Sequence, residues 1–86
     1  MTPTKQRRKP RVAIYVGLQE HREEIGWSIP ELIAKLEGNS MSERSIRRLE
    51  EGKAIRAENA NRVFNTIKRF HPSGAELSRD DYVKVV

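Results

Sequence analysis

The sequence predicts an all-α domain, a compact unit of four to five short helices that allows a short β-strand at either end. Apolar residues recur at helical spacing in four segments between residues 14 and 70. Capping and turn signals separate these segments by only a few residues. With 86 residues, the chain is long enough for one domain with a small core.

The first helical pattern begins near residue 14. Four residues have the spacing of one helix face: Ile14, Leu18, His21 and Ile25. The segment VAIYV, residues 12–16, is rich in β-branched side chains, so this region could instead begin as a strand. Gly26 is typical of the end of a helix. We interpret His21 as a packing residue, because two distant histidines without cysteine do not form a metal site.

The second helix is predicted by its first turn. Ser28-Ile29-Pro30-Glu31 has the S-x-x-E form of a capping box, and proline is tolerated in a first helical turn. Leu32, Ile33 and Leu36 give this helix an apolar face. The segment GNS, residues 38–40, indicates a turn after it.

The third helix lies in SERSIRRLEEGK, residues 42–53, which holds three arginines, three glutamates and two large apolar residues. On a helical wheel of residues 43–51, Ile46 and Leu49 point toward the core, while Glu43 and Glu50 lie on the flank. The opposite face carries Arg44, Arg47, Arg48 and Glu51. We expect Glu43–Arg47 and Arg47–Glu51 pairs to offset the repulsion between Arg44 and Arg48. A short helix that follows a tight turn and begins with polar side chains has the layout of a helix-turn-helix.

A fourth helix is predicted from Ala57 to Phe70, with an apolar stripe of Ala60, Val63, Phe64 and Ile67. Trp27 and Phe64 are expected to be core anchors. The segment His71-Pro72-Ser73-Gly74 ends the helix, and His71 is there a favourable C-terminal cation. The final DYVKVV alternates like a short strand, which would need residues 12–16 or another subunit as its partner.

The charge pattern divides the chain. Residues 1–11 hold five of the 17 basic residues and none of the 12 acidic ones, so the remainder is balanced with 12 of each. We therefore expect a flexible basic arm over residues 1–11, a helix-turn-helix domain over residues 12–70, and an extension over residues 71–86 that is a candidate dimerisation element. A basic arm alone favours a polyanionic partner only modestly.

Several classes of protein are disfavoured by the sequence. Cysteine is absent, which excludes disulfides and thiolate zinc sites. No apolar run approaches the ~20 residues that cross a bilayer, and no apolar block follows the basic N-terminus. No phosphate loop, nucleophile elbow or spaced carboxylate pair is present. We therefore expect a cytoplasmic protein, associated with the nucleoid when bound to DNA, without enzyme activity, metal, cofactor or membrane partner.

The chain resembles the Xre-type, lambda-repressor-like helix-turn-helix regulators over about residues 13–70. The matching frame runs from Leu18 and Arg22 through Gly26-Trp27-Ser28 and Glu31-Leu32, and its closest part is S-I-x-x-L-E-x-G-K at residues 45–53. The resemblance implies base contacts from Glu43, Arg44 and Arg48, and a structural ion pair between Arg22 and Glu50. It also implies phosphate contacts, by the backbone of Ser28 and Ile29 and by Ser42, Arg47, Lys53 and the arm residues Lys5, Arg7, Arg8 and Lys9.

One departure from the family pattern bears on Glu43. The turn before the third helix, residues 36–42, is three residues longer than the family's usual L-G-V-S. If Ser40 is the N-cap, it forms a second capping box in which Glu43 folds back onto the backbone. If Ser42 is the N-cap, Glu43 is free to accept a hydrogen bond from cytosine.

The function implied by the resemblance is sequence-specific binding of double-stranded DNA, as a repressor at an operator or promoter. One such domain touches few base pairs, so a homodimer on an inverted repeat is expected. The alternatives are the DNA-binding antitoxin of a toxin–antitoxin pair, and an antiactivator that binds another regulator. A tail of 16 residues is short for wrapping a toxin. An excisionase-like architectural role would bend DNA.

Overall fold

Five α-helices and a small antiparallel sheet make up the part of the chain that the computed structural model describes, residues 11–36 and 41–86. The domain is mostly helical, and a short strand lies near each end of the described chain, as the sequence allowed; an additional internal strand completes a three-stranded sheet, so the fold is not strictly all-α. The elements in chain order are β1 (Val12–Tyr15), α1 (Leu18–Ile25), α2 (Ile29–Lys35), α3 (Glu43–Glu50), β2 (Ile55–Arg56), α4 (Ala57–Phe70), a 3₁₀ turn η2 (Gly74–Glu76), α5 (Arg79–Tyr82) and β3 (Val83–Val85).

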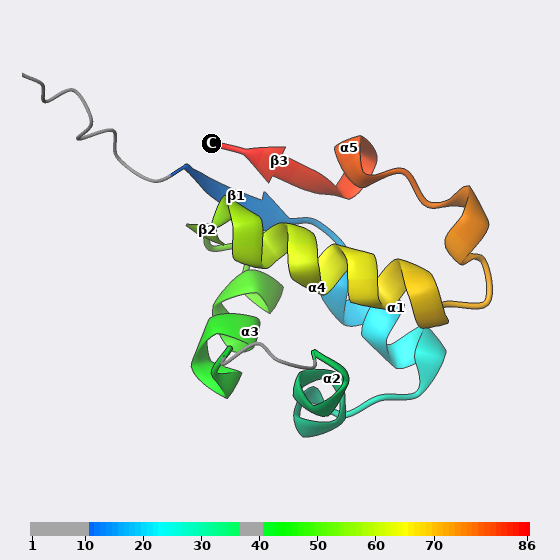
Figure 1. Ribbon diagram of the computed structural model, residues 1–86. Coiled ribbons are helices and arrows are strands. Elements are labelled where there is room, and N and C mark those ends of the chain that lie inside the picture. The colour runs from blue at the N-terminus through cyan, green and yellow to red at the C-terminus, as the bar shows by residue number, and fades with distance from the viewer. Residues whose placement is uncertain (1–10, 37–40) are drawn as a thin grey trace, which may run out of the picture.

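Helix α4 organises the domain, because the sheet and the helices α1 and α5 all lie against it (Figure 1). The sheet runs along one side of α4, α1 also packs on α4, and α2 packs on α3, which itself contacts α1, β1 and β2. The bounds of α4, Ala57–Phe70, are those that the apolar stripe predicted. The same elements bring α3 to an outer edge of the molecule, where its polar face is free of the core.

The sheet has the strand order β2-β1-β3, with both pairs antiparallel. The first four residues of VAIYV therefore form a strand, and the helical pattern that began at Ile14 is wrong there. Gly17, at φ +89°, turns the chain from β1 into α1. The C-terminal strand pairs within the chain, with Tyr15 opposite Val83 and Ala13 opposite Val85. Of the two partners that the sequence allowed for this strand, residues 12–16 and another subunit, the structure shows the first.

The predicted helix boundaries hold where a capping signal marked them. Gly26, at φ +95°, ends α1, and its N–H donates to the carbonyls of Arg22 and Glu23. Ser28 and Glu31 form the complete capping box of α2. These helix ends therefore lie where nearby residues in the sequence supply hydrogen-bond partners for the terminal backbone groups.

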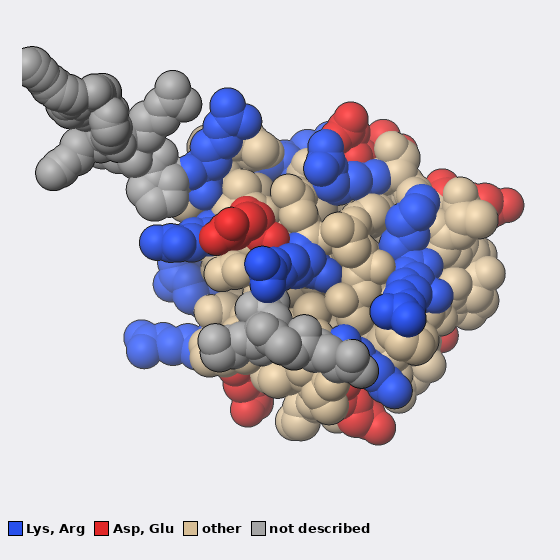
Figure 2. Space-filling model, viewed as in Figure 1, with Lys and Arg blue, Asp and Glu red and all other residues tan. Residues whose placement is uncertain are grey.

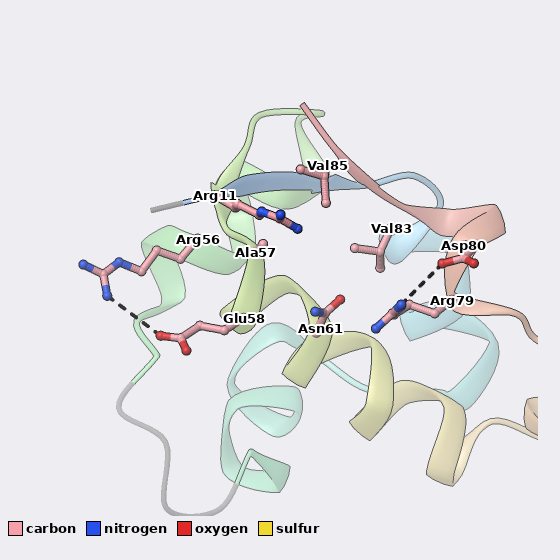
Figure 3. Close-up of a pocket in the computed structure, with 9 residues that line it drawn as sticks. All are labelled: Arg11, Arg56, Ala57, Glu58, Asn61, Arg79, Asp80, Val83 and Val85. Atoms are coloured by element: carbon pink, nitrogen blue, oxygen red, sulfur yellow. Dashed lines mark hydrogen bonds and ion pairs between the residues drawn. The ribbon is translucent and has the colours of Figure 1, made fainter. Parts of the chain in front are cut away.

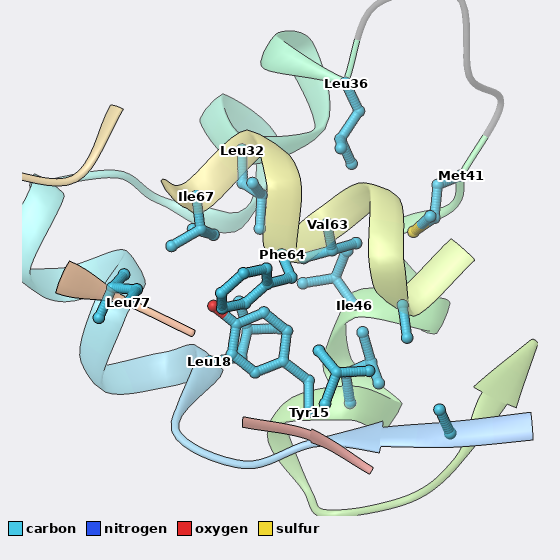
Figure 4. Packing of buried hydrophobic residues seen from close by; sticks show 14 residues of the cluster. Tyr15, Leu18, Leu32, Leu36, Met41, Ile46, Val63, Phe64, Ile67 and Leu77 are labelled. Atoms are coloured by element: carbon cyan, nitrogen blue, oxygen red, sulfur yellow. The ribbon is translucent and has the colours of Figure 1, made fainter. Parts of the chain in front are cut away.

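The core lies between β1, α4 and the inner faces of α1 to α3 (Figure 4). Phe64 is 1% exposed and packs on Tyr15, with ring centroids 5.6 Å apart. Trp27 is not such an anchor: it is half-buried and packs edge-on against Phe70, which is 42% exposed. Leu77 and Val83 are also buried, so residues 71–86 complete the core of the domain.

A polar cluster lies at the edge of this core, between β1, α1 and α5. The Tyr15 hydroxyl lies 3.0 Å from His21 Nδ1, and the His21 ring packs edge-on against Tyr82. His71, expected to be only a favourable helix-end cation, places Nε2 2.6 Å from Glu24 Oε1, and its side chain is 7% exposed. Burial raises the pKa of Tyr15, so its hydroxyl stays protonated, and the tautomer of His21 decides which of the two groups donates.

Protonation of His21 is expected to destabilise the fold. Burial, and next the neighbouring His71, lower its pKa, and Glu24 and Glu20 oppose this only in part. Because the folded-state pKa lies below the unfolded value, the unfolded chain binds more protons, and stability falls as the pH drops through about 6.5. Thermal melts between pH 7.5 and 5 should show a smaller loss of Tm for His21→Gln, which keeps an acceptor for Tyr15. Equal losses in both proteins would rule out His21 as the cause.

No helix in the described residues is both long enough and apolar enough to cross a membrane.

Candidate nucleic-acid interface

Ser42 is the residue that caps the N-terminus of α3, which begins at Glu43. The Ser45 N–H donates to Ser42 Oγ at 3.2 Å, so Ser42 is the N-cap. Ser40, the alternative N-cap, lies outside the described residues. Glu43 is the first helical residue, and its carboxylate accepts a hydrogen bond from Arg47 Nη2 at 2.6 Å. Glu43 therefore points along the exposed face of α3, where it pairs with Arg47 and does not fold back onto the backbone.

The inner face of α3 is fixed by two kinds of contact. Ile46 and Leu49 are 0% and 1% exposed within the core. Beside them, Arg22 of α1 holds Glu50 through two hydrogen bonds, Nε to Oε2 at 2.5 Å and Nη2 to Oε1 at 3.1 Å. A third Arg22 nitrogen, Nη1, donates to the carbonyl of Trp27 at 2.8 Å. The resemblance implied this Arg22–Glu50 pair, and the structure brings the two side chains together.

The Arg22–Glu50 pair is nearly out of solvent, with side-chain exposures of 12% and 10%. The hydrogen bond from Glu50 raises the pKa of Arg22 above its already high value, so the guanidinium stays charged. A bidentate pair in this setting fixes geometry more than it adds stability. It sets the rotation of α3 about its axis, and therefore the direction of its outer face.

The outer face of α3 presents three exposed arginines. Arg47 is occupied by Glu43. Glu51 pairs with Lys53 at 3.2 Å, so the Arg47–Glu51 pair expected from the sequence is replaced by one within the following turn. Among residues 11–36 and 41–86, neither Arg44 nor Arg48 takes part in an ion pair. Both guanidinium groups are thus available to an external acceptor.

Basic side chains continue beyond α3 along the same edge of the domain. Figure 2 shows several basic side chains projecting from the edge where α3 and β2 lie, and others spread over the rest of this face. Lys53 and Arg56 are exposed there, and β2 contacts α3. Arg11 joins them at the start of β1, where its carbonyl accepts a hydrogen bond from the Ala57 N–H at 2.9 Å. Sequence patterns missed Arg56 because one arginine between two helices has no periodicity; its neighbours become visible only through the β1–β2 pairing.

The N-terminus of α2 is less suited to phosphate than the resemblance implied. The Ser28 N–H already donates to Glu31 Oε1 at 2.7 Å, and the Glu31 N–H donates to Ser28 Oγ. Hydrogen bonds from Ser28 lower the pKa of Glu31, which keeps a negative charge at this helix end. A phosphate would have to displace that carboxylate. Contacts from Ser28 and Ile29 stay predictions, as do those from Lys5, Arg7, Arg8 and Lys9, which lie outside the described residues.

Comparison of the chain with protein-family models, with curated proteins and with solved structures finds no match.

Proposed function

We propose that this chain is a helix-turn-helix regulator of the lambda-repressor-like type, which binds double-stranded DNA with α3 in the major groove. The main support for this proposal is that one face of α3 is fixed by contacts with the domain, whereas the opposite face is exposed. Ile46, Leu49 and the Arg22–Glu50 pair hold it in one orientation. Arg44 and Arg48 then project outward without an ion pair among the described residues. Such a rigid display of forked donors suits recognition of base edges.

The spacing of the two free arginines suits two nearby bases. Arg44 and Arg48 are four residues apart, which corresponds to about 6 Å along the helix axis. Successive base pairs are about 3.4 Å apart along the duplex. Each guanidinium can donate two hydrogen bonds to the O6 and N7 atoms of a guanine. The favoured target therefore contains two guanines about two base pairs apart in each half-site.

Glu43 is a third candidate for base contact, but its ion pair with Arg47 would have to break first. The pair is exposed on both sides, with side chains 46% and 61% accessible. An exposed pair of this kind contributes about 0–1 kcal/mol, so DNA could separate it at little cost. Glu43 would then accept from cytosine, and Arg47 would move to a phosphate, in line with the roles that the resemblance implies.

Repression by occupying an operator is the simplest activity for such a domain. One α3 reads only a few base pairs, so we expect a homodimer on an inverted repeat. The antitoxin alternative is disfavoured because residues 71–86 fold back onto β1 and α4, with Leu77 and Val83 in the core. The antiactivator alternative draws support from Phe70, an aromatic side chain 42% exposed beside Trp27. Binding to a protein and not to DNA would favour that reading.

Removing either free arginine is expected to weaken binding to operator DNA by about 1–3 kcal/mol, a loss of roughly 5- to 150-fold. Arg44→Ala and Arg48→Ala should each also relax the preference at one base position, because each loses one base-edge contact. Fluorescence anisotropy on operator DNA with single-base changes measures both effects. Arg69→Ala, an exposed arginine at the far end of α4, is the matched control. Equal affinities for all four proteins would remove α3 as the reading element.

A further inference from the structure

A cavity of about 500 Å³ lies between the first turns of α4, strand β3 and α5. Its lining combines arginines with an apolar wall: Arg11, Arg56, Asn61, Arg79, Val83 and Val85. Figure 3 shows the side chains of Arg11 and Arg79 extending from opposite sides toward the space in front of the two valines, with Asn61 facing the same space from α4. A concave site with a few converging polar groups and an apolar wall is the usual form of a small-molecule site.

The charges around this cavity leave one cation in excess. Two acidic residues line it with the three arginines. Arg56 is 3.8 Å from Glu58, and Arg79 is 3.5 Å from Asp80. Among the residues that the structure describes, Arg11 takes part in no ion pair. The cavity as a whole is therefore complementary to a single negative charge.

We propose that this cavity binds a small organic monocarboxylate. The planar, forked guanidinium of Arg11 matches the two oxygens of a carboxylate, and Arg79 and the Asn61 amide supply further donors. The exposed side of Val85, 58% accessible, and its neighbour Val83 would cover the apolar part of the ligand. A compact apolar group such as a phenyl ring or a branched alkyl chain fits the available volume.

A ligand bound in the cavity would weaken DNA binding, because it would neutralise Arg11. This consequence rests on the proposed function. The Arg11 carbonyl accepts from the Ala57 N–H at 2.9 Å, which joins the start of β1 to the start of α4 beside Arg56. Arg11 also directly follows the basic residues 1–9 along the chain. A carboxylate that neutralises Arg11 removes a cation from this basic edge, so the ligand should weaken DNA binding and lower the salt slope by about 0.9.

The ligand site is testable without DNA, by a two-dimensional ¹H–¹⁵N NMR titration of the full chain at constant ionic strength. The probes are benzoate, its neutral isostere benzamide, and inorganic phosphate. We expect benzoate to give saturable shifts at Asn61, Val83 and Val85, with binding at least tenfold tighter than that of benzamide or phosphate. Unsaturable shifts, equal shifts from benzoate and phosphate, or shifts confined to α3 would overturn the site.

Variants identify the groups that hold the carboxylate. Arg11→Gln and Arg79→Gln should each weaken benzoate binding about tenfold, and Arg69→Gln, which lies outside the lining, should not change it. Unchanged spectra away from the cavity verify the fold of each variant. A matched loss in Arg69→Gln would show a general charge effect and overturn the proposal. In a second experiment, benzoate should weaken DNA binding by the wild type and not by Arg11→Gln; benzoate binding without this effect overturns the regulatory link alone.

Discussion

Replacing Glu50 by alanine is expected to lower the free energy of unfolding by about 3–5 kcal/mol. The change leaves the Arg22 guanidinium buried and unpaired, with only the Trp27 carbonyl as a remaining acceptor. The loss is large because a charge stays in a region where water is scarce, and the attraction that offset its desolvation is gone. Urea unfolding followed by circular dichroism measures the change, provided that the slope of the transition stays the same.

Two further variants separate this effect from a general loss of charge. Glu51→Ala removes the adjacent carboxylate, which is 59% exposed and pairs with Lys53, and should cost no more than about 1 kcal/mol. The double variant Arg22→Met with Glu50→Leu removes both charges and should recover most of the stability. It should nevertheless bind DNA less selectively, because α3 loses the contact that sets its rotation. A Glu50→Ala protein as stable as Glu51→Ala would contradict the structural role of the pair.

Replacing Phe64 by alanine is expected to cost about 3–5 kcal/mol of stability. Phe64 lies in the middle of α4 and contacts Tyr15 of β1 and Tyr82 of α5, with ring centroids 5.6 Å and 6.3 Å away. The cavity left behind would adjoin β1, the strand to which both β2 and β3 pair. The surroundings can collapse only slightly there, so the full cost of lost transfer energy and of the void applies.

Phe70→Ala is the matched control for this change. It removes the same side chain from the same helix, at a position 42% exposed to solvent. We expect less than half of the loss seen for Phe64→Ala, because Phe70 loses contacts mainly with Trp27 and with the cations of Lys35 and Arg69. Similar losses for the two variants would show that α4 does not organise the core as described.

The parts of the fold that sequence reasoning predicted are those with a local cause. The capping box at Ser28, the C-cap at Gly26 and the apolar stripe of α4 each act within one or two turns, so a single segment shows them. The same holds for the inward direction of Ile46 and Leu49. The position of Glu50 on the core flank of α3 likewise made a partner for it predictable.

The parts that could not be predicted depend on distant contacts. VAIYV fits a strand and also the start of a helix, and the choice is made by pairing with Val83–Val85 across the length of the chain. Trp27 looked like a core anchor by its type alone, but the end of α4 places Phe70 against it near the surface. The meeting of His21, His71 and Tyr82 joins three segments that share no sequence signal.

In the candidate interface, too, features with a local cause were predictable from the sequence and features that depend on other segments were not. The wheel placed Arg44, Arg47 and Arg48 together because a helix face is a local property. The wheel did not show that Lys53 would form an ion pair with Glu51, or that Glu43 would be the ion-pair partner of Arg47. These pairings depend on the N-cap of α3 and on the turn after it. These pairings single out Arg44 and Arg48 as the arginines without an ion pair in the described residues.

The most direct test of sequence-specific DNA binding by α3 is a salt titration of the full chain on the DNA upstream of its own gene. We predict a saturable complex that survives nonspecific competitor DNA at low salt and protects a short inverted repeat. Its affinity should fall linearly in a plot of log K against log salt concentration, by about 0.9 for each phosphate neutralised. Failure to retain this DNA at low salt, or a complex that competitor DNA of any sequence removes equally well, would contradict α3 as a sequence-reading helix.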